Sequence, residues 1–259
     1  MVALWPREHY VAGGGPAEVA LIALSTAKLP DPLPVSRVRH GMPDEGQGAG
    51  SLALVARDRV DDPAWFASHV LAPFNELITS DLGPASAAAA LAAEHAYVIE
   101  AHLDDPDDLG HLQAAWALAK CVCEEGASVV IDVYAARAHL GAEVAALSPS
   151  RVFDVMHEVT LFFDEQGDGT LAGWSLGLKK FGRPDIVMLD IAPESATEAA
   201  LLLRDIAASL ADGERIEPGD QLARADGNVL VAAAFDANVS SVVAVDGPAV
   251  LLGPVRASP

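Results

Sequence analysis

The chain has 259 residues, of which 51% are hydrophobic, and its 37 acidic and 16 basic residues give a formal net charge of −21. A chain of this length can bury a core without disulfides or metals. Its charge disfavours nucleic acid and anionic membranes as partners and favours a basic protein, although an acidic surface also simply keeps an alanine-rich protein in solution.

The first residues, to about residue 17, end in Gly13-Gly14-Gly15-Pro16 and are predicted to form a flexible lead. They contain no basic segment followed by an apolar one, as a secretory signal would. No apolar run approaches the roughly 18 residues of a membrane span. We therefore expect a soluble, cytoplasmic protein. Its two cysteines, Cys121 and Cys123, lie two apart in a predicted helix and cannot pair within it.

The first half of the chain alternates predicted strands and helices. Asp61-Asp62-Pro63 is a typical helix start, so a helix is predicted from there to about Ile78, and a second one after Pro84. The predicted strands of this half are 18–24, 51–57, 96–103 and 128–135. With the helix predicted at 109–125, the last two strands form a βαβ unit, which is normally parallel.

The apolar spacing of the 109–125 helix predicts which side faces the core. Leu112, Trp116 and Cys123 repeat at three and four residues and should point inward. Gln113, Lys120 and Glu124 should then face solvent.

The second half resembles a meander. Strands are predicted at 157–163 and 170–178, joined by a hairpin turn at Asp168-Gly169. A third strand at 185–191, a helix from Glu194 to Leu210 and strands at 228–235 and 239–245 follow. The fold class is therefore α+β with mixed sheets. An α/β-like half, 1–147, is joined to an α+β half, 152–259, either as two domains or as one fused domain.

The stretch GLKKFGRPD, residues 177 to 185, comes close to a phosphate-binding loop. Such a loop follows a strand and opens a helix, whereas the residues that follow here are strand-like. Pro184 also removes a hydroxyl for magnesium and a backbone N–H. We therefore predict a structural turn over 175–186, with Phe181 in the core and no nucleotide site.

The segment Ser175–Ile186 does resemble the hallmark of a bacterial family, domain of unknown function 4261. In that family a small polar residue and a G-[ML] pair precede two variable positions, which are followed by an [FY]-G-x-P-[DE]-[IL] motif. The similarity extends over about residues 157–210. It implies a shared fold element and no catalytic residues, and some such domains are suspected of acting as immunity or interaction modules.

Lys179, Lys180 and Arg183 form the densest basic cluster of this acidic chain. They are candidates for an anion contact, and neutralisation by nearby carboxylates is the simpler explanation. His102, the aspartates that follow it and His111 include types of residue that bind metals, but helix capping explains them better. We predict no metal, no cofactor and no catalytic residue.

Two acidic stretches follow predicted strands of the first half. If those strands are parallel neighbours, the carboxylates share one edge of the sheet and form a face for a partner. The candidate partner-binding residues are Asp58, Asp61, Asp62, Asp104, Asp105, Asp107 and Asp108.

The leading functional hypothesis is a non-enzymatic interaction module whose acidic face binds a basic protein, as an immunity protein or antitoxin would. One alternative is a small-molecule-binding protein or hydrolytic enzyme. Its cleft would bring together His102, the Asp104–Asp108 carboxylates, Tyr134, Arg137 and His139. The other alternative is a structural component of a bacterial assembly.

Overall fold

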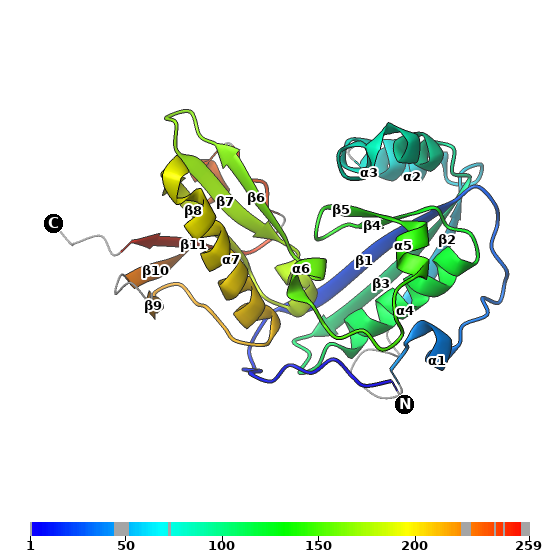
Figure 1. The fold of residues 1–259 in the computed structure, drawn as a ribbon, viewed down its shortest axis with the longest axis horizontal. Coiled ribbons are helices and arrows are strands. Elements are labelled where there is room, and N and C mark those ends of the chain that lie inside the picture. Colours follow the sequence, from blue (N-terminus) through cyan, green and yellow to red (C-terminus); the bar gives the residue numbers. More distant parts are fainter. Residues whose placement is uncertain are drawn as a thin grey trace. The chain divides into compact units, whose positions relative to one another are not determined.

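Figure 1 shows the computed structural model of the chain, which describes residues 2–43, 52–71, 74–223, 229–240, 242–245 and 247–254. The chain divides into two compact units. Unit 1 comprises Met1–Pro6 and Ala17–Phe153, and unit 2 comprises Arg7–Pro16 and Asp154–Pro259. Each unit combines a sheet with helices, so the predicted α+β fold class is confirmed.

Unit 1 is built on a five-stranded sheet. In order across the sheet, its strands are β2 (Ala53–Asp58), β3 (His95–Asp104), β1 (Pro16–Ser25), β4 (Val129–Asp132) and β5 (Arg137–Leu140). The pairs β2–β3, β1–β4 and β4–β5 are antiparallel. The N–H of Glu94 donates to the carbonyl of Ser25 at 3.0 Å, which joins the end of β1 to the start of β3. These two strands are therefore antiparallel as well.

The predicted βαβ connection is present in a split form. β3 and β4 run in the same direction, and α4 (Gly110–Glu124) connects them along the chain. However, β1 lies between them in the sheet, so the two strands do not pair with each other.

Helices cover both faces of this sheet (Figure 1). α2 (Pro63–Phe66), a π-helical turn at Ala67–Leu71 and α3 (Phe74–Leu91) lie over one face, and α4 and α5 (Gly141–Ala145) lie over the other. The core beneath α3 contains Ile22 and Leu24 of β1 and Val98 of β3. Because side chains alternate along a strand, the other even-numbered positions of β1 and β3 face the same way. The short helix α1 (Arg37–His40) follows β1 along the chain.

The orientation predicted for α4 is only half right. Leu112, Trp116 and Cys123 are buried as expected. Gln113 and Lys120, predicted to face solvent, are also buried, with 4% and 6% of their surface exposed. The reason is that α4 is covered on its outer side too.

The N-terminal residues provide part of that cover, and the prediction of a flexible lead is wrong. Trp5 is buried, its N–H donates to Gln113 Oε1 at 3.1 Å, and its carbonyl accepts from the N–H of Leu109 at 3.0 Å. The amide of Gln113 donates in turn to the carbonyl of Ala3 at 2.8 Å. On the same helix, Lys120 pairs with Glu124 at 2.8 Å.

Unit 2 is built on a six-stranded mixed sheet. In order across the sheet, its strands are β6 (Thr160–Glu165), β7 (Leu171–Leu176), β8 (Asp185–Ile191), β11 (Ala249–Pro254), β10 (Val229–Ala234) and β9 (Gln221–Ala223). β8 and β11 are parallel, and the other neighbours are antiparallel. α7 (Ala196–Ala211) packs against β7 and β8, and the short helix α6 (Val155–Glu158) precedes β6.

The hairpin predicted at Asp168-Gly169 is confirmed: Gly169 has a φ of 83°, and the Asp168 carboxylate accepts from the N–H of Thr170 at 3.0 Å. Two strand predictions are wrong in part or whole. His157 and Glu158 belong to α6, because Asp154 caps that helix through the N–H of Met156 at 3.0 Å. The described residues of 239–245 form no strand, because Asp236 starts a helical turn there. The sequence analysis missed β9 and β11 in this unit and β5 in unit 1.

Candidate functional site

Unit 1 has an open groove of about 380 Å³ beside the first residues of β1. Because alternate positions of a strand share a face, Glu18 and Ala20 on β1 meet Glu100 and His102 on β3 there. The residues lining the groove are Glu18, Val19, Ala20, Ala53, Glu100, Ala101, His102 and Tyr134.

Glu18 is the central polar residue of this groove. The hydroxyl of Tyr134 donates to Glu18 Oε2 at 2.6 Å. The other carboxylate oxygen, Oε1, lies 3.6 Å from Nδ1 of His102. Glu18 is 24% exposed at its side chain and His102 is 64% exposed, so the carboxylate is held in place while the imidazole faces solvent.

The groove has an acidic character. Two carboxylates, Glu18 and Glu100, are among its lining residues, and none of the lining residues that the structure describes is a lysine or arginine. Glu100 is exposed. A cationic group entering the groove would therefore meet two carboxylates, a phenol and an imidazole, all of which can accept hydrogen bonds.

Of the residues predicted to converge in a cleft, the structure brings together only His102 and Tyr134. His139 packs edge-on against Trp116 of α4, with ring centroids 5.2 Å apart, and so points to the opposite face of the sheet. Ala138, between His139 and Arg137, belongs to the core beneath α3, so Arg137 shares the face of His139. Glu18 was missed because a single glutamate at the start of an apolar strand has no signal of its own.

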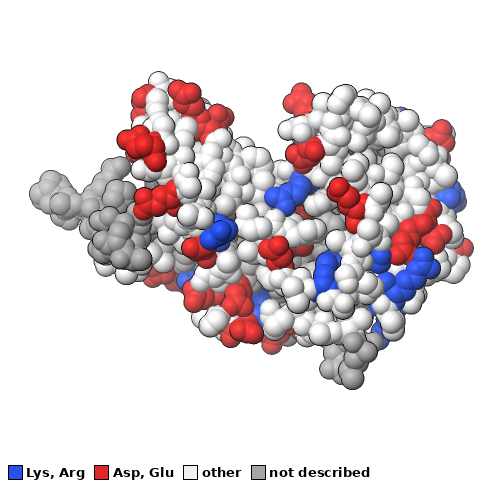
Figure 2. All heavy atoms as spheres, in the orientation of Figure 1, with Lys and Arg blue, Asp and Glu red and all other residues white. Residues whose placement is uncertain are grey.

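The two acidic stretches do not share an edge of the sheet, contrary to the expectation. β2 and β3 are antiparallel, and Asp58 pairs with His95, the first residue of β3. Asp104 is the last residue of the same strand. The stretches therefore lie at opposite ends of β3. Figure 2 shows acidic side chains spread over many elements of the visible face rather than gathered in one patch.

Several of these aspartates have local structural partners. Asp58 lies 3.3 Å from Nδ1 of His95, and Asp62 lies 3.2 Å from Arg57. Asp108 accepts from the N–H of Gly110 at 2.7 Å, at the start of α4. Within the described residues, no three histidine, cysteine, aspartate or glutamate side chains are grouped so that they could hold a metal ion.

In unit 2, the segment 175–186 is the structural turn that was predicted. A short 3-10 helix, Leu178–Phe181, connects β7 to β8, and Phe181 is fully buried. Gly177 and Gly182 flank this helix with φ values of 119° and 63°, which glycine adopts without strain.

The basic cluster in this turn does not form a surface anion site. Lys180 is fully buried, and its Nζ lies 2.7 Å from Oε2 of Glu158. Burial alone would raise the pKa of Glu158, but the charge of Lys180 and the contact with His157 outweigh it and hold that pKa well below its usual range. Lys179 is only partly buried.

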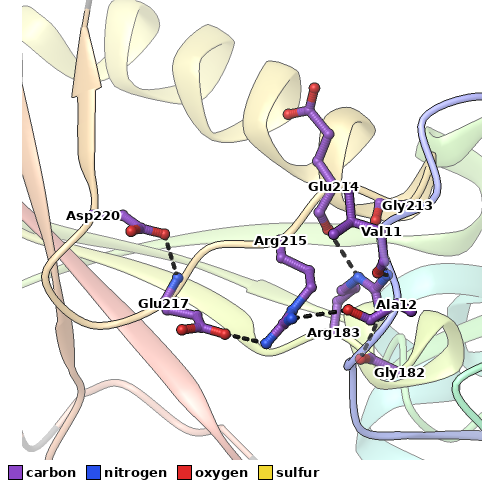
Figure 3. A network of polar contacts seen from close by, with 9 residues as sticks. All are labelled: Val11, Ala12, Gly182, Arg183, Gly213, Glu214, Arg215, Glu217 and Asp220. Carbon is purple, nitrogen blue, oxygen red and sulfur yellow. Dashed lines mark hydrogen bonds and ion pairs between the residues drawn. The ribbon is translucent and has the colours of Figure 1, made fainter.

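Arg183 also has an internal role, at the end of α7 (Figure 3). Its guanidinium is buried and donates to the carbonyls of Glu214 and Gly213, both at 2.8 Å, and to that of Val11 at 3.0 Å. Gly213 and Glu214 lie just after the end of α7, so Arg183 joins the turn that follows this helix to the backbone at Val11. Sequence reasoning missed this role because the three acceptors are distant along the chain.

No helix among the described residues is long and apolar enough to cross a membrane. Comparison with known proteins finds no matching family model, no matching curated protein and no matching solved structure.

Proposed function

We propose that the protein is a non-enzymatic binding module that captures a basic group of a protein partner in the groove lined by Glu18, Glu100, His102 and Tyr134. The observation that carries this proposal is the presence of two carboxylates in one open groove whose described lining residues include no lysine or arginine. The hydrogen bond from Tyr134 holds Glu18 in place, so little side-chain entropy is lost when a cation binds.

The charge of the whole chain supports the same proposal. A net charge of −21 attracts a basic protein from a distance and speeds its encounter with the groove. The resemblance of Ser175–Ile186 to domain of unknown function 4261 adds an immunity or antitoxin role as the first one to test. Such a protein would work in the cytoplasm, beside a basic toxin.

A second candidate function rests on Glu18 itself. The carboxylate lies between the phenol of Tyr134, at 2.6 Å, and the imidazole of His102, at 3.6 Å. Three groups of this kind in one groove could exchange protons with a bound small molecule, as an acid–base enzyme requires. This candidate predicts binding of a small neutral or cationic compound rather than of a peptide.

The test is the affinity of the full chain for a short arginine-rich peptide, measured by calorimetry at 50 mM salt. Replacing both groove glutamates (Glu18→Gln, Glu100→Gln) should weaken binding about tenfold, since each partly exposed charge pair contributes on the order of 0.5–1 kcal/mol. The matched control replaces Glu94 and Glu143, exposed residues of the same unit, and leaves the affinity within about twofold. Equal losses in the two double variants would reject the groove as the binding site.

A further inference from the structure

The edge strand β2 presents exposed residues next to the groove. β2 is the first strand in the order of the unit 1 sheet and pairs on one side with β3. Ala53, Leu54 and Ala56 are exposed, whereas Val55 packs partly against the core beneath α3. Ala53 also lines the groove. The edge of β2 and the groove therefore adjoin within unit 1.

The direction of the backbone groups of β2 follows from two bonds at the far end of the strand. The N–H of Arg59 donates to the carbonyl of the residue before β3 at 2.9 Å and so points to β3. The carbonyl of Asp58 accepts from the N–H of Asp62 at 2.8 Å and so points away from β3. These two directions alternate along an antiparallel strand. The N–H and C=O groups of Leu54 and Ala56 therefore point away from β3 as well.

These four groups of Leu54 and Ala56 are here called the open edge. Within the part of the chain that the structure describes, none of them is bonded to another backbone group. Residues 53–56 carry no charge. Edge strands are usually protected by charged side chains, by proline or by a covering element, because an exposed edge pairs with other chains. An uncharged edge beside an acidic groove therefore favours an extended basic segment as ligand.

A strand added to the open edge would bring its side chains to the groove. Because Ala53 pairs with Glu100, a residue beside Ala53 would lie two strand spacings, roughly 10 Å, from the backbone of Glu100. A long basic side chain and a glutamate side chain can span this distance together, and the small side chain of Ala53 leaves room for them in the groove. Two residues further along, the added strand would pass Val55 on the same face of the sheet.

We propose that the partner binds as an extended segment that adds a strand to the open edge, a proposal that rests on the binding function proposed above. The open edge provides the backbone hydrogen bonds, and Glu100 and Glu18 accept the basic side chain that lies beside Ala53. The segment then carries an arginine or lysine and, two residues away, an apolar residue that contacts Val55. Main-chain bonds give such complexes affinity, and alternate side chains give them specificity.

The first test is Ala56→Pro in the full chain. Proline removes the outward N–H of this residue, keeps the bonds between β2 and β3, and suits the extended residue before it. The probe is a short capped peptide in which an arginine and a valine stand two residues apart among threonines. Its affinity, measured by calorimetry, should fall about tenfold. The matched control is Gln221→Pro, in the edge strand β9 of unit 2, which should change the affinity less than about twofold.

The second test keeps the wild-type protein and changes the peptide. Methylating the central backbone nitrogens of the probe removes its donors without changing its charge, so the affinity should again fall about tenfold. With the unmethylated probe bound, amide hydrogen exchange followed by NMR should slow at Leu54 and Ala56. The amides of Val55 and Arg57 point to β3 and should keep their rates. These measurements decide the proposal even if Ala56→Pro does not fold.

Three results would overturn the proposal. Equal affinity for the methylated and unmethylated probes would show that the peptide backbone makes no bonds to the protein. Unchanged exchange at Leu54 and Ala56 would show that the open edge is not the place of binding. A dimer that forms without peptide and is split by Ala56→Pro in sedimentation experiments would show that a second copy of the chain covers the edge.

The same probe separates this proposal from the proposed function. If methylation weakens binding and replacement of Glu18 and Glu100 does not, the open edge binds a strand and the groove does not capture the cation. If replacement of the two glutamates weakens binding and methylation does not, the groove keeps its function and the added strand is rejected. A wild-type protein that does not bind the unmethylated probe would reject both.

Discussion

Asp185 is a buried carboxyl group whose protonation should govern part of the stability of unit 2. Burial raises its pKa from 3.8 to about 6, although the Ser175 hydroxyl at 2.7 Å and the N–H of Leu178 at 3.2 Å favour the charged form. Between pH 3.8 and about 6 the folded state therefore holds a proton that the unfolded state has lost. Stability is greatest below this window and falls as the pH rises through it.

The variant Asp185→Asn keeps an oxygen for both hydrogen bonds and removes the charge. A pKa shift from 3.8 to about 6 corresponds to about 3 kcal/mol. As the pH rises from 4 to 7, the free energy of unfolding of the variant should therefore increase by about 3 kcal/mol relative to that of wild type. Urea unfolding of both proteins at several pH values measures the difference. A difference that stays constant with pH would show that Asp185 does not change protonation in this range.

At the residue scale, the sequence predicted burial better than it predicted partners. Phe181 was placed in the core from its position between two glycines, and it is fully buried. Lys180 and Arg183 were read as a basic cluster because they are close in sequence. Their acceptors, Glu158 and the carbonyl of Val11, lie 22 and 172 residues away, and no local pattern reveals a contact at such a distance.

The helix α4 is the element whose environment differs most from the prediction. The spacing of apolar residues along α4 correctly placed Trp116 in the core. This spacing could not show that the N-terminal residues cover the opposite side of the helix, because that contact joins Trp5 to Gln113 across 108 residues. The strand predictions had the same limit. Apolar runs in the sequence located the strands, whereas the antiparallel pairing of β2 with β3 depends on contacts between residues distant in sequence.

This second covered side of α4 can be tested with Gln113→Ala. The side chain accepts from the N–H of Trp5 and donates to the carbonyl of Ala3, so its removal leaves two backbone groups without partners. The free energy of unfolding should fall by about 1–3 kcal/mol. Gln221→Ala, at an exposed position of β9, should change it by less than about 0.5 kcal/mol. Equal effects in chemical denaturation would mean that the N-terminal residues do not cover the helix in solution.

At the scale of the whole molecule, the charge and the groove should act on different steps of binding. The chain has 37 acidic and 16 basic residues, so at least 21 carboxylates have no cationic partner under one-to-one pairing. Carboxylates spread over the surface attract a basic partner from a distance and change its on-rate, whereas groups inside the contact change its off-rate. Asp104 at the end of β3, and Asp105 and Asp107 just after it, are not among the residues that line the groove, so they should change the on-rate.

Neutralising Asp104, Asp105 and Asp107 together, with asparagine, separates the two effects. Asp108 is left in place because it accepts from the N–H of Gly110, the first residue of α4. At low salt the triple variant should bind the arginine-rich peptide with an on-rate about two- to fivefold lower and an unchanged off-rate. This difference in on-rate should nearly disappear at 0.15 M salt, where the Debye length is about 8 Å.

The variant without the groove glutamates should show the opposite behaviour, with an off-rate that is faster than wild type at both salt concentrations. Stopped-flow kinetics over a salt series measures both rates, and an off-rate raised by the aspartate variant instead would place the partner on the end of β3 rather than in the groove.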